Sequence, residues 1–144
     1  MDIIHKTVGQ MLNEISRAYP KNDALIHTEA GVRLNYQLLY WETERIALGL
    51  LNIGIRKGDR VVLFLEKSLT FITAHLALQK IGAISVPLNP GFKRAEMVYL
   101  LGDADPKVIL CDPQKREMVA GIAPDSQVRV VDARQPYPDP ALFG

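Results

Sequence analysis

The sequence has little of several features that mark specialised classes of protein. Cys111 is the only cysteine, so no disulfide can form within the chain, and a reducing, cytoplasmic location is expected. The 17 lysine and arginine residues nearly balance the 16 aspartate and glutamate residues, and this balance predicts neither a nucleic-acid partner nor binding to an acidic membrane surface. No apolar run approaches the roughly 18 residues that a membrane-spanning helix needs, so no membrane span is predicted.

Motifs that carry catalysis or phosphate binding are also missing. The sequence contains no G-x-x-x-x-G-K-[ST] loop, no G-x-G-x-x-G after a predicted strand and no G-x-S-x-G turn. The three histidines, His5, His27 and His75, have no metal-ligand spacing with one another or with Cys111. We therefore predict no catalytic residue and no metal ligand, and we interpret Cys111, at the end of an apolar run, as a buried structural thiol.

The first part of the chain has the pattern of helices around a hairpin. Apolar residues recur at spacings of three and four along residues 7–19, which predicts an amphipathic helix, and again along 36–52. Between them, strands over 24–28 and 32–34 are joined by a short turn, so a hairpin is expected. Asn35 is placed to cap the second helix, and Gly54 supports its end.

From residue 60 onward, apolar runs alternate with helical patterns. Strands are predicted to begin near residues 61, 84, 108 and 128, with helices over 68–81, 93–101 and 114–121, and Gly102 is expected to end the second of these helices. This spacing indicates consecutive βαβ units on a parallel sheet with right-handed crossovers. The expected fold is therefore α/β, with flanking helices and an N-terminal hairpin.

Three segments occur in an order that is typical of one enzyme family. Residues 34–39 (LNYQLL) resemble the pattern L-[TS]-Y-x-E-L, and residues 54–62 (GIRKGDRVV) resemble G-[VI]-x-K-G-D-R-V. Residues 78–90 (LQKIGAISVPLNP) resemble L-K-A-G-A-x-x-V-P-L-[ND]-P. Together they resemble the AMP-forming acyl-CoA synthetases, whose relatives are luciferases and the adenylation domains of peptide synthetases. The segment at 102–107 is similar to that of carboxylate–CoA ligases of the fatty-acid or malonate type.

This resemblance implies both a place in a larger fold and a reaction. Residues 1–131 would be a fragment of the large N-terminal domain of an AMP-binding acyl-CoA ligase, and residues 132–144, with three prolines, a truncated linker or loop. The full-length enzyme would join a fatty acid or related carboxylic acid to ATP as an acyl-adenylate, and CoA would then displace AMP. The implied cofactors are ATP, Mg²⁺ and CoA, and none of them is expected to bind tightly to this chain.

The chain departs from the family pattern in two ways. Leu38 stands where the first motif has a glutamate, which removes half of a capping box and is expected to cost up to about 1 kcal/mol of local helix stability. Family members are several times longer, and their Ser/Thr/Gly-rich phosphate loop and catalytic lysine lie beyond the stretch that ends here at Gly144. The 144 residues alone are therefore expected to be catalytically inactive.

One loop is a candidate for ligand binding. By its position after the third segment, the loop formed by Asn89, Pro90 and Gly91 resembles the loop that borders the CoA nucleotide groove in acetyl-CoA-synthetase-like members. A glycine at position 91 would let a ligand approach the backbone closely. The alternative is an ordinary Pro-Gly turn that leads into the next helix.

Two alternatives stay open for the chain as a whole. It could be a stand-alone α/β module that holds a nucleotide at the switch point of the sheet, although residues 65–68 (LEKS) are a poor phosphate cradle. It could also be a self-association module, a homodimer or a domain-swapped form, which uses apolar surface that the rest of a larger enzyme would cover.

Overall fold

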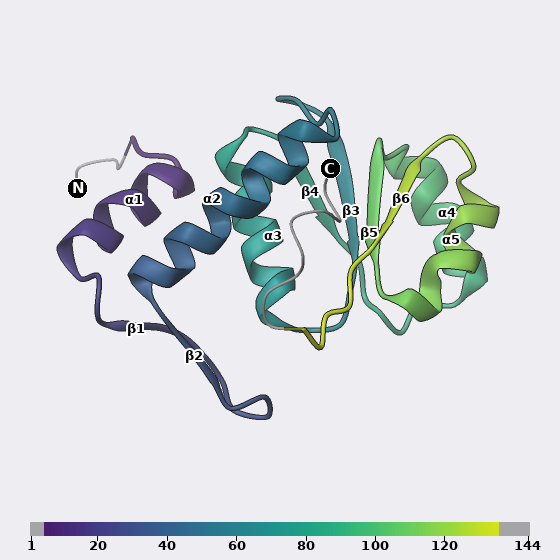
Figure 1. The fold of residues 1–144 in the computed structure, drawn as a ribbon. Helices are drawn as coiled ribbons and strands as arrows, with labels where there is room; N and C mark the ends of the chain where they lie inside the picture. Colours follow the sequence, from purple (N-terminus) through teal and green to yellow (C-terminus); the bar gives the residue numbers. More distant parts are fainter. Residues whose placement is uncertain (1–4, 136–144) are drawn as a thin grey trace.

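A helix and a hairpin precede a four-stranded α/β sheet in the computed structural model, which describes residues 5–135 (Figure 1). The elements in chain order are α1 Val8–Ala18, β1 Asp23–His27, β2 Val32–Asn35, α2 Tyr36–Asn52, β3 Arg60–Phe64, α3 Leu69–Lys80, β4 Ile84–Pro87, α4 Arg94–Ala104, β5 Val108–Cys111, the 3₁₀ turn η1 Pro113–Lys115, α5 Arg116–Ile122 and β6 Gln127–Val130. None of the helices within residues 5–135 is long and apolar enough to cross a bilayer.

The four-stranded sheet is entirely parallel and has the order β4-β3-β5-β6. Helices α2 and α3 cover one face, and α4 and α5 cover the other (Figure 1). Successive residues of the central strand β3 point to opposite faces, so Val61 and Leu63 pack with α2 and α3, whereas Val62 and Phe64 pack with α4 and α5. The predicted α/β fold with a parallel sheet is confirmed.

The hairpin forms a sheet of its own. Strands β1 and β2 pair antiparallel, and they extend away from the helices in Figure 1. The turn between them uses Gly31 at φ +65°, a conformation that favours glycine. The side chain of His27 stabilises this turn because its Nδ1 accepts a hydrogen bond from the Ala30 N–H at 3.1 Å.

The helix ends follow local chemistry, with one correction to the expected boundaries. The Asn35 side chain caps α2 by accepting a hydrogen bond from the Leu38 N–H at 2.8 Å, and Gly54 follows the helix at φ +93°, as predicted. Gly102 does not end α4, which continues to Ala104. The helix ends instead at Asp105, which adopts the left-handed conformation at φ 43°, one that aspartate tolerates better than most residues.

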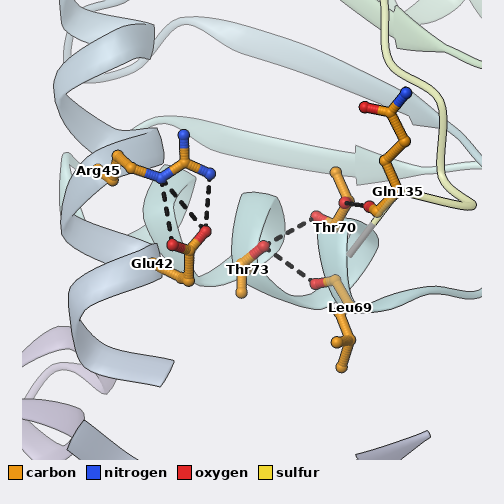
Figure 2. A network of polar contacts seen from close by, with 6 residues as sticks. All are labelled: Glu42, Arg45, Leu69, Thr70, Thr73 and Gln135. Atoms are coloured by element: carbon orange, nitrogen blue, oxygen red, sulfur yellow. Dashed lines mark hydrogen bonds and ion pairs between the residues drawn. The ribbon is translucent and has the colours of Figure 1, made fainter. Parts of the chain in front are cut away.

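The segment after β6 packs beside α3. Thr70 Oγ1 donates to the Gln135 carbonyl at 3.3 Å, and the neighbouring Thr73 hydroxyl donates to the Leu69 and Thr70 carbonyls within the helix (Figure 2). The Gln135 N–H in turn donates to the Asp132 carbonyl at 3.0 Å. The predicted linker or loop over 132–144 therefore begins as a turn on α3, and its residues 136–144 lie outside the described part of the chain.

Candidate functional site

The candidate site lies at the carboxyl ends of β3 and β5, where the chain direction across the sheet reverses. After β3 the chain turns through residues 65–68 into α3 on one face, whereas after β5 it turns through η1 into α5 on the opposite face. The two neighbouring strands therefore send their connections apart. In parallel α/β sheets this switch point leaves a crevice in which ligands commonly bind.

Two backbone donors at this switch point are occupied by the protein's own side chains. Asp112, which is only 6% exposed, accepts a hydrogen bond from the Glu66 N–H at 2.8 Å. Ser68 caps α3 by accepting from the Phe71 N–H at 3.0 Å. A phosphate that used these two N–H groups would have to displace a carboxylate and a hydroxyl, which agrees with the interpretation of residues 65–68 as a poor phosphate cradle.

Two adjoining hollows follow the carboxyl edge of the sheet, and we call them together the carboxyl-edge groove. One, of about 580 Å³, lies among the hairpin turn, the turns that follow β3 and β5, and residues 132–134. The other, of about 820 Å³, extends past the end of β4 to Asn89 and Pro90. Both hollows are lined by His27, Glu29, Glu66 and Lys67. The hairpin tip and the parallel sheet thus form opposite walls of one groove.

The first hollow carries charges of both signs. Its cationic lining residues are Lys67, Lys115 and Arg134, and its acidic ones are Glu29, Glu66, Asp112 and Asp132. Arg134 is already bound to Asp132, with Nε 3.0 Å from Oδ1, and this hydrogen bond lowers the pKa of Asp132. The groove therefore offers no surplus of positive charge for a polyphosphate.

The structure places the loop formed by Asn89, Pro90 and Gly91 at the rim of the second hollow. Asn89 Oδ1 accepts a hydrogen bond from the Gly91 N–H at 2.8 Å, and the Asn89 carbonyl accepts from the Phe92 N–H at 3.0 Å. A Cβ at position 91 would lie 3.2 Å from Asn89 Oδ1, so glycine allows the turn to close tightly. The internal bonds describe a turn leading into α4, and the CoA contact stays a prediction.

The histidines take part in local contacts. His75 of α3 forms a hydrogen bond through Nδ1 with Ser85 Oγ of β4 at 2.8 Å, and through Nε2 with the Gln79 side chain at 2.8 Å. This chain of side chains ties α3 to the edge strand. Within residues 5–135, no group of three or more histidine, cysteine, aspartate or glutamate residues is arranged to hold a metal ion.

Two side chains at the groove, Asp112 and Lys115, were not singled out from the sequence. Asp112 follows directly on the buried strand β5, which is the position where a polar residue reaches the carboxyl edge of a parallel sheet. That position is a signal that could have identified it. Lys115 carried no comparable signal because its role depends on the Pro90 carbonyl, which lies 25 residues earlier in the chain.

Comparison with known proteins links this arrangement to one family. Residues 12–142 match the family model described as AMP-binding enzyme. The chain is 36% identical over 99 residues to the mitochondrial medium-chain acyl-CoA ligase ACSF2 of Rattus norvegicus, a match that covers 69% of this chain and 16% of that protein. The chain thus spans about a sixth of the length of this relative.

Solved structures show the same fold. The N-terminal domain of FACL13 from Mycobacterium tuberculosis superposes with a TM-score of 0.80 at 26% identity, covering 87% of this chain and 33% of that one. ATP-bound MatB from Rhodopseudomonas palustris superposes with a TM-score of 0.75 at 30% identity, covering 92% of this chain and 27% of that one.

Proposed function

The chain belongs to the AMP-binding enzyme family, and from that premise we propose that it forms part of the N-terminal region of an AMP-forming carboxylate–CoA ligase. The observation that carries the proposal is the family match over residues 12–142, together with a fold that superposes on the N-terminal domain of a fatty acyl-CoA ligase. The proposed substrate is a fatty acid or related carboxylic acid, which the whole ligase would convert to an acyl-adenylate and then to an acyl-CoA.

The described residues do not fit Mg-ATP. They present no cluster of carboxylates or histidines for a metal, and the Glu66 and Phe71 N–H groups at the switch point already bind Asp112 and Ser68. Phosphoryl chemistry needs cations and backbone donors aimed at the developing negative charge. ATP and Mg²⁺ would therefore be held by other residues of the ligase, and this chain alone is proposed to be inactive.

The contribution of this chain is a wall of the ligase. The parallel sheet fixes the carboxyl-edge groove, and the loop at Asn89, Pro90 and Gly91 forms its rim. CoA, when bound, supplies the thiol that accepts the acyl group. We propose that this rim borders its nucleotide end, where Asn89 and Gly91 shape a compact turn that a ligand can approach.

Carboxylate-dependent exchange of pyrophosphate into ATP tests the inactivity of the chain. Assayed across a panel of fatty acids and shorter carboxylic acids, the 144-residue chain is expected to give no exchange above the buffer blank. Clear turnover by the chain alone would overturn the proposal that its active site lies elsewhere.

A chimera tests the role as a wall. Residues 12–142, placed in a family ligase in exchange for the matched region, should preserve formation of acyl-CoA. The same exchange with Asp112→Ala should lower the stability of the chimera. A chimera that also lacks residues 89–91 should still form the acyl-adenylate but use CoA less well. A folded chimera of this kind with an unchanged dependence on CoA would contradict the proposed rim.

One observation favours a second candidate function. The hollow of about 580 Å³ lies at the switch point of a doubly wound sheet, which is a common place for a mononucleotide. Micromolar binding of a mononucleotide by the chain in calorimetry would favour a stand-alone binding module. We expect no such binding, because the Glu66 and Phe71 N–H groups at the switch point are already engaged and the hollow has no surplus of positive charge.

The compartment also belongs to the proposal. The single, buried Cys111 is compatible with a reducing cytoplasm, whereas the rat relative is named a mitochondrial protein. Fractionation of the source cells with an antibody against the chain distinguishes the two locations.

A further inference from the structure

We propose that Lys115 is a positioning residue that holds the loop of Asn89, Pro90 and Gly91 in place from the β5 side of the carboxyl edge. Its Nζ donates a hydrogen bond to the Pro90 carbonyl at 2.6 Å. The statement that this loop borders a CoA groove rests on the function proposed above. The mechanical role of Lys115 rests only on the contacts described here.

Lys115 reaches this loop by crossing the central strand. It stands at the end of η1, which follows β5, whereas Pro90 follows β4, and β3 lies between these two strands. The ammonium group of Lys115 lies 4.7 Å from the centroid of the Phe64 ring at the end of β3. This distance permits a cation–π interaction, so the fully buried Phe64 guides the lysine across the sheet edge.

Leu88 and Phe92, on either side of the loop, pack against the core on the α4 and α5 face of the sheet, but the loop has few other hydrogen bonds to the sheet. Its bonds from Gly91 and Phe92 to Asn89 are internal, and they shape the turn without fixing where it lies. On its β3 side, the Leu88 N–H donates to the Leu63 carbonyl at 2.9 Å, just before the turn begins. Lys115 therefore supplies the hydrogen bond that joins the turn itself to the β5 side of the sheet.

The base of Lys115 is itself fixed. Its N–H donates to the Asp112 carbonyl at 2.9 Å, and the Asp112 carboxylate accepts from the Glu66 N–H. The short segment 112–115 thus contacts two turns. The Asp112 side chain binds the turn after β3, and the Lys115 side chain binds the turn after β4. Lys115 lines the first hollow and Pro90 the second, so their contact lies where the two hollows of the carboxyl-edge groove meet.

Backbone order parameters of the loop amides test the positioning role. In the unaltered chain, the Gly91 and Phe92 amides should have values near those of rigid backbone, about 0.85. Lys115→Met keeps the aliphatic stem but removes the donor, and the two values should fall toward about 0.6. Lys115→Arg should restore them, because a guanidinium can donate to the carbonyl and stack on the Phe64 ring.

Lys107→Met is the matched control. Lys107 also donates from Nζ to a backbone carbonyl, that of Gly54 at 2.6 Å, but it precedes β5 and so lies at the opposite edge of the sheet. Its loss should leave the Gly91 and Phe92 amides unchanged. If Lys115→Met fails to fold, Lys115→Leu, which also has no donor, takes its place. A folded Lys115→Met or Lys115→Leu chain with unchanged order parameters would overturn the positioning role.

Titration with CoA separates this inference from the proposed function. Millimolar CoA should shift the Gly91 and Phe92 amide resonances of the unaltered chain and of Lys115→Arg, and should shift those of Lys115→Met less. If CoA shifts nothing in the unaltered chain while Lys115→Met still loosens the loop, the CoA role of the loop fails and the positioning role stands.

Discussion

The carboxylate of Asp112 lies 2.8 Å from the backbone nitrogen of Glu66 and binds it, although 46 residues separate the two in sequence. This bond joins the turns that leave β3 and β5 for opposite faces of the sheet. It also places an internal anion where a doubly wound protein could bind an external one. At the switch point of this sheet, the chain's own carboxylate therefore occupies a backbone donor that an external anion could have used.

Removal of the Asp112 carboxylate should destabilise the fold. Asp112→Ala leaves the Glu66 N–H without its partner, and the free energy of unfolding in urea should fall by about 1 to 3 kcal/mol. Asp112→Asn keeps an acceptor oxygen, so its free energy of unfolding should fall by less than that of Asp112→Ala. Asp103→Ala, at an exposed position of α4, is the control and should change the value by less than about 0.5 kcal/mol. Equal stability of the Asp112→Ala and Asp103→Ala chains would show that the bond contributes nothing.

The Cys111 thiol should make the free energy of unfolding depend on pH in the alkaline range. Burial, with a smaller effect from the charge of Asp112, raises the pKa of this thiol from 9.0 to about 11. Below about pH 9 the thiol is protonated in both states, so the free energy of unfolding is unaffected. Between pH 9 and 11 only the unfolded chain ionises, and the folded state should lose about 2 to 3 kcal/mol.

Urea unfolding at several pH values measures this dependence. Cys111→Ala lowers stability at every pH, but it should lack the additional loss between pH 9 and 11, so the difference between the two chains isolates the thiol. The same burial predicts that thiol reagents label Cys111 only after unfolding. Rapid labelling of the folded chain would contradict the buried, protonated state.

Two buried threonines should respond differently to the same substitution. Thr43 Oγ1 has no hydrogen-bond partner among the residues that the structure describes, whereas Thr73 Oγ1 donates to the Leu69 carbonyl at 3.0 Å (Figure 2). Thr43→Val should therefore raise the free energy of unfolding by roughly 1 kcal/mol, since a buried hydroxyl without a partner is costly. Thr73→Val should be neutral or destabilising. A stabilisation by Thr73→Val as large as that by Thr43→Val would refute this explanation.

Helix α1 should mediate self-association of the chain. Val8, Met11, Ile15 and Tyr19 follow one another at helical spacing, and each is between 37% and 56% exposed. A second copy of the chain that presents the same stripe would cover this apolar surface. Light scattering at high protein concentration should detect a dimer, and Met11→Glu should weaken it. Val98→Glu, on α4, is the control. A strictly monomeric mass at high protein concentration would contradict self-association through α1.

Local chemistry explains which parts of the fold could be predicted. The cap of Asn35 and the left-handed Gly54 depend on neighbouring residues, so the sequence predicts the bounds of α2 correctly. The prediction that α4 ends at Gly102 is wrong because a glycine within a helix is only a weak stop signal. The left-handed conformation that ends the helix is adopted by Asp105 instead. In α1 the apolar spacing was recognised, but of Val8, Met11, Leu12 and Ile15 only Leu12 is buried.

The groove could be predicted only in part. The loop of Asn89, Pro90 and Gly91 follows a predicted strand, so its place at the carboxyl edge follows from the parallel sheet. The contacts of Asp112 with Glu66 and of Lys115 with Pro90 join segments that are distant in sequence. Which side chains meet across the edge depends on the strand order, and the spacing of the strands alone does not determine that order.

The strand order also has a consequence for synthesis on the ribosome. The central strand β3 pairs with β4 on one side and with β5 on the other, and β5 is the later of the two along the chain. A nascent chain can therefore complete the ladders on both sides of β3 only after Cys111 has emerged from the exit tunnel. Until then one edge of β3, with the apolar residues Val61, Val62 and Leu63, remains open to pairing with another chain. Expression conditions that slow synthesis between β4 and β5 should accordingly favour aggregation.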